Sequence, residues 1–260
     1  MPDPTTPTPE PTPGAVQPGT AVIIPAKDEG DRIASTVRAA LRLPGVDLVL
    51  VVDDGSADTT AQIAADAGAR VVRHSRNRGK AAAMETGAEA VRLLDEHERV
   101  PSRHLLFLDA DLGDTARDAA PLIEPIASGT ADMTIAVFSS LVKLGGHGFV
   151  VRLSRDGIQR ATGWTATQPL NGQRCLTRAA FEAARPLAPG FGVETAMTID
   201  LLRKDFRITE VEVPLAHRAT GTDYRAQLHR ARQFRDVARA LSTRDPAVRD
   251  QLAKLRRRAR

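Results

Sequence analysis

Two carboxylates at the end of an apolar run are the residues of this sequence best placed to do chemistry. In HLLFLDADLGD the apolar run ends at Asp109, and Asp111 follows after the small Ala110. Alternate side chains of a strand share a face, so the two carboxylates lie together if strand geometry continues that far. Like charges this close raise one pKa unless a cation lies beside them. A hard ion such as Mg²⁺ or Mn²⁺, with phosphate oxygens completing its shell, would resolve this conflict.

Three further polar clusters also follow apolar runs. They are PAKDE at 25–29, DDGS at 53–56 and NRGK at 77–80. Lys80 comes directly after Gly79 at a predicted helix start, where a positive charge and backbone donors suit phosphate. A nucleoside diphosphate with a metal ion fits this set of residues.

The elements around these clusters alternate between strands and helices. Apolar runs predict strands at 21–25, 47–54, 69–74, 104–109 and 131–138, and helical spacing predicts helices at 31–43, 58–68 and 79–97. This order implies a mostly parallel sheet with helices on both faces. Because ligands of such sheets bind beyond the carboxyl ends of the strands, all four polar clusters are expected on one rim.

Composition excludes several classes of protein. A chain of 260 residues with 42% hydrophobic content can form one large domain. The single Cys175 excludes an internal disulfide, and no apolar signal segment is found near the N-terminus, so a cytoplasmic location is expected. No run approaches the roughly 18 to 20 apolar residues that span a bilayer. Any membrane contact would therefore be peripheral, at the inner face.

The two ends of the chain differ in character. Residues 1–19 hold seven of the 17 prolines and predict a disordered tail. Residues 222–260 form a basic helical segment whose apolar stripe packs on the domain or on a second subunit, and whose terminal LRRRAR could meet anionic lipid. The stripe consists of Leu228, Ala231, Phe234, Val237, Ala238 and Leu241. With 3% aromatic residues and no nucleic-acid motif, nucleic acid is not an expected partner.

The ordered motifs VIIPAKDE, VVDDGSADTT, NRGKAAAMETG and FLDADL resemble the nucleotide-sugar-binding half of GT-A glycosyltransferases of the family 2 type. The resemblance covers about residues 21–138 and implies a Rossmann-like α/β fold in a single domain. It implies a nucleotide-sugar half at 20–140 and an acceptor-side half at 141–221. The residues it implies for binding the nucleotide sugar are Pro25, Ala26, Lys27, Glu29, Asp53, Asp54, Gly79, Lys80, Asp109 and Ala110.

Individual roles also follow from the resemblance. The residues of the first two clusters would surround the base and ribose, Lys80 would lie near the uracil or the diphosphate, and Asp109 would reach the ribose. Asp111 would hold Mg²⁺ or Mn²⁺ and serve catalysis through that DXD pattern. Family members more often have Asn where this chain has Asp28.

The second half resembles two groups of enzymes. QPLNGQRCLTRAAFE is similar to the acceptor-side segment of polyprenyl-phosphate hexose synthases and of glucosyl-3-phosphoglycerate synthases, and the later GFGVE pattern is closer to the second group. In that group a histidine after the last strand completes the metal shell, which implies His217 here. Glu194 is either a helix-start carboxylate or an acceptor-binding group or general base. Arg174 is either a strand-edge charge or a ligand for an acceptor phosphate or carboxylate.

The expected activity is metal-dependent transfer of a hexose from a UDP- or GDP-sugar. The acceptor is a small phosphorylated or carboxylated metabolite such as 3-phosphoglycerate, or a polyprenyl phosphate at the membrane surface. The closer resemblance favours retention of the anomeric configuration. A sugar nucleotidyltransferase is a further alternative, although PAKDEGDR lacks the glycine-rich loop typical of that class.

Overall fold

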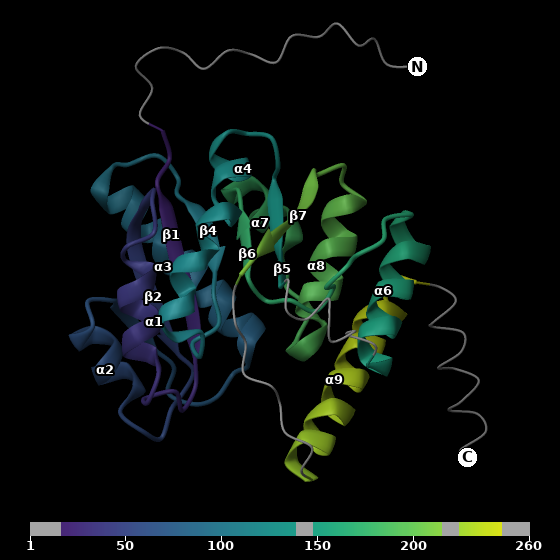
Figure 1. Cartoon of the computed structure of the whole chain (residues 1–260), viewed down its shortest axis with the longest axis horizontal. Helices are drawn as coiled ribbons and strands as arrows, with labels where there is room; N and C mark the ends of the chain where they lie inside the picture. The colour runs from purple at the N-terminus through teal and green to yellow at the C-terminus, as the bar shows by residue number, and fades with distance from the viewer. Residues whose placement is uncertain (1–16, 139–147, 215–223, 246–260) are drawn as a thin grey trace, which may run out of the picture.

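The computed structural model describes residues 17–138, 148–214 and 224–245. Its centre is one seven-stranded sheet in the order β3-β2-β1-β4-β6-β5-β7 (Figure 1). The strands are β1 Thr20–Ala26, β2 Val46–Asp53, β3 Arg70–Arg73, β4 His104–Phe107, β5 Met133–Phe138, β6 Arg174–Leu176 and β7 Ile208–Val213. β1, β2 and β5 consist mainly of buried apolar residues, as is typical of strands covered on both faces.

All strand pairs are parallel except the two that β6 forms. β1 pairs with β2 and β4, β2 with β3, and β5 with β7, all in parallel. β6 lies antiparallel between β4 and β5. The mostly parallel α/β sheet expected from the sequence is therefore confirmed, while β6 is not among the predicted strands because three residues are too few to show a periodicity.

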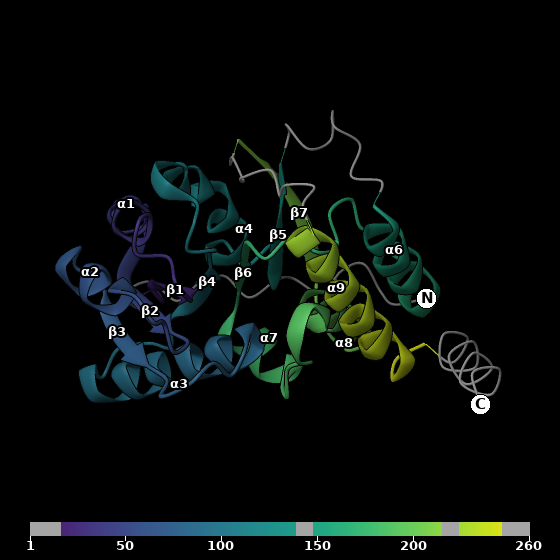
Figure 2. The ribbon, with the colours of Figure 1, turned by 90° about the horizontal axis from the view of Figure 1, so that it is seen from below.

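Helices cover both faces of this sheet (Figure 2). One face carries α1 Ile33–Ala40, α2 Thr60–Asp66, the 3₁₀ helix η1 Gly113–Leu122 and α4 Glu124–Ala127. The other face carries α3 Lys80–Glu98, α7 Arg178–Ala184 and α8 Val193–Leu202, with the short η2 Gly190–Gly192 leading into α8. The alternation of strand side chains separates the core into these two layers: Val22 and Ile24 face α1, whereas Ala21 and Ile23 face α3.

Two more helices, α6 Phe149–Thr162 and α9 Tyr224–Ser242, pack on α8 beyond the sheet (Figure 2). Val237 and Leu241 of α9 are fully buried against Ile158 and Ile199. These residues belong to the stripe predicted from sequence, which thus packs on helices of this same chain. The side chains of Leu228 and Ala231, also in that stripe, lie outside the described part.

The two terminal predictions fall largely outside the structure. Residues 1–16 of the predicted tail and residues 246–260 of the basic segment are not among the described residues. Within the described ranges, no helix is both long and apolar enough to cross a membrane.

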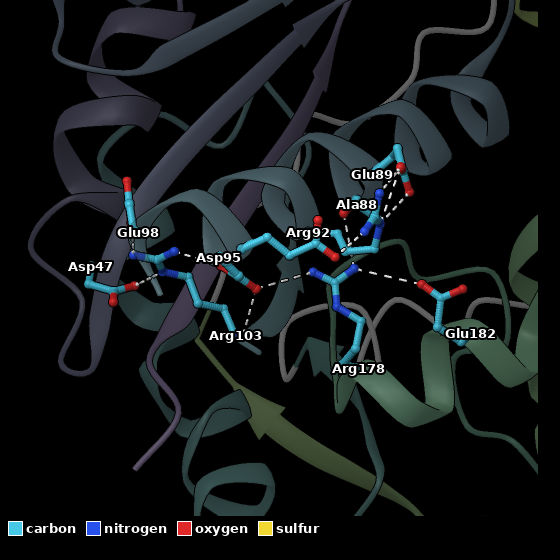
Figure 3. Close-up of polar contacts among 10 residues, drawn as sticks. Asp47, Ala88, Glu89, Arg92, Asp95, Glu98, Arg103, Arg178 and Glu182 are labelled. Atoms are coloured by element: carbon cyan, nitrogen blue, oxygen red, sulfur yellow. Dashed lines mark hydrogen bonds and ion pairs between the residues drawn. The ribbon is translucent and has the colours of Figure 1, made fainter. Parts of the chain in front are cut away.

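A cluster of charged side chains lies where the strands begin (Figure 3). Arg103, just before β4, donates from its Nε, Nη1 and Nη2 to three carboxylates: Asp47 at 2.9 Å, Asp95 at 2.6 Å and Glu98 at 2.7 Å. Arg178, at the start of α7, lies 3.7 Å from Asp95. Arg103 and Asp95 are both at least 95% buried. This charge cluster therefore connects β2, α3, β4 and α7 at the end of the sheet opposite to the polar clusters.

Candidate active site

The polar clusters meet at the carboxyl rim of the sheet, as the topology requires. β1, β2 and β3 end side by side, with Ala26 opposite Asp53 and Asp53 opposite Arg73. β4 ends at Phe107, so Asp109 and Asp111 lie in the turn after the strand. The expectation from sequence required strand geometry to continue as far as Asp111, and it does not. The alternation of strand side chains therefore does not determine where these two carboxylates point.

The loop after β1 is bonded to the loop after β2. The Ala26 carbonyl accepts a hydrogen bond from the amide of Asp54 (2.8 Å), and the carboxylate of Asp28 accepts one from the amide of Ala57 (2.7 Å). Asp28 has φ 55°, a left-handed conformation that Asp and Asn adopt more readily than other side chains. Asp28 in place of the family's usual Asn thus retains the backbone conformation and ties the two loops together. Pro25 is half-buried beneath them, and Lys27 is exposed.

The paired aspartates at the end of β2 organise backbone around them. Asp53 is fully buried, accepts a hydrogen bond from the Ser56 amide (2.8 Å) and forms an ion pair with Arg73 (3.0 Å). Asp54 accepts hydrogen bonds from the amides of Arg78 (2.8 Å) and Gly79 (2.7 Å).

Asp54 also contacts His74, whose Nδ1 lies 2.7 Å from Oδ1 of the carboxylate. The other nitrogen of His74 lies 2.9 Å from the Thr86 hydroxyl. Burial by itself raises the pKa of Asp54, but the bonds from His74, Arg78 and Gly79 hold it below its ordinary value. Asp54 therefore shapes the loop that precedes α3, a role that His74 shares and that the sequence argument did not identify.

Lys80 joins the two halves of the chain at the rim. Its Nζ lies 2.9 Å from Oδ1 of Asp109 and 3.1 Å from Oε1 of Glu194. Burial lowers the pKa of Lys80, but the two carboxylates more than offset this and hold it above its ordinary value. Gly79 precedes it with φ 89°, a conformation that favours glycine and that turns the chain into α3. The predicted site residues Lys80, Asp109 and Glu194 are thus brought together, with Glu194 only 7% exposed in the first turn of α8.

The turn that contains Asp111 is held by α1. The hydroxyl of Thr36 donates to the Ala110 carbonyl (2.8 Å) and accepts from the Gly113 amide (2.8 Å). Thr36 is fully buried and comes from a helix more than seventy residues earlier in the chain. Ala110 therefore acts through its backbone, and sequence spacing alone offered no signal for Thr36.

Asp111 lines an acidic cavity of about 250 Å³. The other lining residues are Asp28, Glu29, Gly30, Asp31, Arg32 and Asp58. Burial, and next the charge of Asp111, raise the pKa of Glu29 above its ordinary value. The carboxylates at this point therefore repel one another, and a cation in the cavity would relieve the repulsion.

The described residues fit a hard divalent ion with an incomplete protein shell. No group of three or more His, Cys, Asp or Glu within the described ranges has metal-binding geometry. Mg²⁺ in nucleotide enzymes is commonly held by one or two carboxylates, with phosphates and water as the other ligands. Asp111 meets that requirement, and Glu29 shares its cavity. His217 lies outside the described residues.

Arg174 is buried inside the second half of the chain. It is 1% exposed and donates to the carbonyls of Asn171 (2.9 Å), Pro169 (3.0 Å) and Glu194 (3.1 Å). Its Nη1 also reaches the Thr198 hydroxyl at 2.9 Å. Burial lowers the pKa of Arg174 to about 10, so the guanidinium stays protonated at neutral pH. The bonds of Arg174 fix the backbone at Glu194, which is the carboxylate on Lys80.

Comparison with known proteins identifies the family and the fold of this chain. Glycosyl transferase family 2 matches residues 21–165. The glycosyltransferase AglJ of Haloferax volcanii is 31% identical over 82% of this chain and 67% of its own length. Among solved structures, glucosyl-3-phosphoglycerate synthase of Mycobacterium tuberculosis in complex with phosphoglyceric acid has TM-score 0.70 and 26% identity, over 87% of this chain and 80% of that one.

A second structure of the same mycobacterial enzyme contains Mn²⁺, UDP-glucose and phosphoglyceric acid. It has TM-score 0.70 and 25% identity, over 87% of this chain and 79% of that one. The fold is thus that of the GT-A glycosyltransferases, an enzyme class that transfers sugars. The chain belongs to glycosyl transferase family 2, and the resemblance seen in its motifs is confirmed.

Proposed function

We propose that this chain is a metal-dependent hexosyltransferase that uses a UDP- or GDP-sugar and a small acceptor bearing a phosphate or carboxylate. The observation that carries the proposal is the position of Lys80 between Asp109 of the first half and Glu194 of the second. One ammonium thereby joins the predicted donor residues to the predicted acceptor residues. The structural likeness to an enzyme solved with Mn²⁺, UDP-glucose and phosphoglyceric acid supports both the donor and the acceptor class.

In this proposal the rim residues bind and orient the substrates. The loops 25–29 and 53–56, tied together through Asp28 and Ser56, form a fixed platform for the nucleoside. Asp111 and His217 would hold Mg²⁺ or Mn²⁺. The bound ion would neutralise the negative charge of the leaving diphosphate. Glu194, held by Lys80 and by the Arg174 bond to its carbonyl, is placed to accept a hydrogen bond from a hydroxyl of a bound sugar or acceptor.

Incubation with labelled nucleotide sugars tests this function. The protein is mixed with UDP-glucose or GDP-mannose, Mn²⁺ and 3-phosphoglycerate, and nucleotide release and labelled product are measured. We expect UDP or GDP release that requires both metal and acceptor. Pyrophosphate formation from a nucleoside triphosphate would instead establish a nucleotidyltransferase, and an inverted anomer in the product would overturn the expectation of retention.

A polyprenyl phosphate is a second candidate acceptor, favoured by one feature of the surface. Phe149 of α6 is 65% exposed and Phe234 of α9 is 37% exposed, and their rings lie 5.3 Å apart. Arg232 and Arg235 are exposed beside Phe234 on α9. Exposed aromatic rings next to arginines suit an anionic membrane surface.

Vesicle flotation and a lipid acceptor separate the two candidates. Binding to vesicles that contain anionic lipid, with loss of binding in Phe149→Ser, together with transfer to a polyprenyl phosphate, would favour the lipid acceptor. Transfer to 3-phosphoglycerate without vesicle binding would favour the small acceptor.

A further inference from the structure

Gln173 lies beside the predicted donor site without having been identified by its sequence context. It stands just before β6, in the second half of the chain, and its side chain is fully buried. Its Nε2 donates to Oδ2 of Asp109 at 2.8 Å, while Lys80 reaches Oδ1 of the same carboxylate at 2.9 Å. Each oxygen of Asp109 thus receives a donor from a different half of the chain.

The orientation of the Gln173 amide follows from its partner. An ionised carboxylate only accepts hydrogen bonds, so the NH₂ group must face Asp109 and Oε1 must point elsewhere. Within the described part of the chain, Oε1 is buried with no hydrogen-bond donor. A buried acceptor without a donor disfavours folding, and this cost offsets part of the stability that the bond to Asp109 contributes.

The backbone around Gln173 is anchored so that the side chain cannot withdraw. The Asn171 side chain donates to the Ala136 carbonyl (2.7 Å) and accepts from the Gln173 amide (3.0 Å), and the Ala136 amide donates to the Gln173 carbonyl (3.0 Å). A Cβ on Gly172 would lie 2.3 Å from Nζ of Lys80. A larger residue at position 172 would push the Lys80 ammonium away from its place beside Asp109, so glycine lets the loop pass close to this ion pair.

We infer that Gln173 is a positioning residue that fixes the Asp109 carboxylate for nucleotide binding. The inference rests on the proposed function, since Asp109 is expected to contact the nucleotide sugar. Gln173 thereby couples the acceptor-side half, through β6, to a carboxylate of the donor side. With Lys80 on Oδ1 and Gln173 on Oδ2, the orientation of the Asp109 carboxylate is fixed from both sides.

Substitution of Gln173 by Met separates positioning from folding. Met conserves the length and volume of the side chain and removes the donor. We expect Gln173→Met to melt close to the temperature of the wild type, because the loss of the bond to Asp109 and the removal of the unpaired Oε1 oppose each other. It should bind UDP with Mn²⁺ about tenfold more weakly in calorimetric titration. A Gln173→Met protein that binds UDP as tightly as the wild type would overturn the inference.

Gln62→Met is the matched control. The Gln62 Nε2 also donates to a carboxylate, that of Asp66, at 2.8 Å, but both groups are exposed on α2. This variant should change neither the melting temperature nor UDP binding. Equal losses of UDP binding in both variants would contradict a specific role for Gln173.

A double-mutant cycle tests whether Gln173 acts through Asp109. In an Asp109→Ala background, Gln173→Met should weaken UDP binding less than twofold, because the group that it positions is already absent. If Gln173→Met weakened UDP binding about tenfold in the Asp109→Ala background as well, Gln173 would act independently of Asp109 and the inference would be overturned.

Failure of the proposed function is recognised separately. If the wild type binds neither UDP nor GDP with Mn²⁺, the donor assignment fails. The hydrogen bond between Gln173 and Asp109 is then tested by ¹⁵N NMR. The side-chain amide signals of Gln173 should shift in Asp109→Ala. Unchanged signals would show that Gln173 does not bond Asp109 in solution, and the positioning role would fall whatever the substrate.

Discussion

The two ends of the sheet each gather charged side chains but arrange them differently. At the strand starts, the planar guanidinium of Arg103 donates to three carboxylates at once (Figure 3). At the strand ends, the ammonium of Lys80 lies between Asp109 and Glu194, and the carboxylates of Glu29 and Asp111 face a shared cavity. The raised pKa of Glu29 records burial and repulsion there.

This difference separates a structural cluster from a binding site. A guanidinium has fixed donors that match several carboxylates, so the charge of Arg103 at the strand starts is paired within the protein. The rim holds a surplus of negative charge around a cavity, which a divalent ion and a diphosphate can share. Changes at the two ends should therefore have separable effects, on folding at one end and on binding at the other.

The largest expected effect is on the rim. Asp111→Ala should lower metal-dependent UDP binding more than a hundredfold, because the ion loses its expected protein ligand. The protein should remain folded, because Asp111 lies on the rim and its repulsion with Glu29 is relieved. Calorimetric titration of UDP with and without Mn²⁺ measures this.

Asp114→Ala is the control, because Asp114 is exposed in η1 only three residues away. His217→Ala should show a milder loss that does not add to that of Asp111→Ala if both residues hold one ion. Wild-type metal dependence in His217→Ala would remove His217 from the site.

The next effect is on the opposite end. Arg103→Met should destabilise the fold by about 3–5 kcal/mol, because the buried carboxylate of Asp95 loses its close partner and keeps Arg178 at 3.7 Å. UDP binding by the folded protein should not change. Denaturant unfolding measures the first quantity and calorimetry the second.

Arg92→Met, which removes surface ion pairs to Glu89 and Glu96 on α3, should lower the stability far less than Arg103→Met, because solvent screens exposed ion pairs. If Arg103→Met weakened UDP binding as strongly as Asp111→Ala, the proposed separation of the two ends would be wrong.

A smaller effect is expected for Lys80→Met. We expect about tenfold weaker UDP binding at low salt, because a charge beside the diphosphate is lost and Asp109 and Glu194 then repel each other. The difference from the wild type should shrink as salt is added. Lys204→Met, at an exposed lysine whose ammonium donates to the Ala183 carbonyl, controls for net charge. A loss that salt leaves unchanged would mean that Lys80 serves the fold alone.

The smallest effect concerns pH. The folded protein holds the pKa of Glu29 above its ordinary value of 4.5, so Glu29 contributes stability at low pH that is lost as the pH rises through its folded pKa. Glu29→Gln should remove this dependence and be the more stable protein at neutral pH. Adding Mn²⁺ should narrow the difference in stability between Glu29→Gln and the wild type, because the ion favours the ionised form of Glu29. The measurement is the free energy of unfolding of both proteins from pH 4 to pH 7. The same pH dependence in both would contradict the repulsion at Glu29.

Much of the rim was predictable from sequence, for a simple reason. Parallel strands end at one edge, so residues that follow β1 to β4 must gather there wherever the side chains point. The type of each side chain then indicated phosphate and metal chemistry at Lys80 and Asp111. Contacts between loops were not predictable, because Asp54 with His74 and Ala110 with Thr36 depend on distances that span the fold.

The sequence by itself determined the alternating strands, the family and the rim on which the polar clusters lie, because these follow from local apolar periodicity and motif order. Only the tertiary structure decided what β6 does. Three residues form a strand there because β4 and β5 supply its partners on both sides. That insertion buries Arg174 under Glu194 and turns Gln173 onto Asp109. From sequence alone, Arg and Gln are expected at the surface. Only their enclosure by distant segments makes Arg174 and Gln173 buried hydrogen-bond donors beside the candidate site.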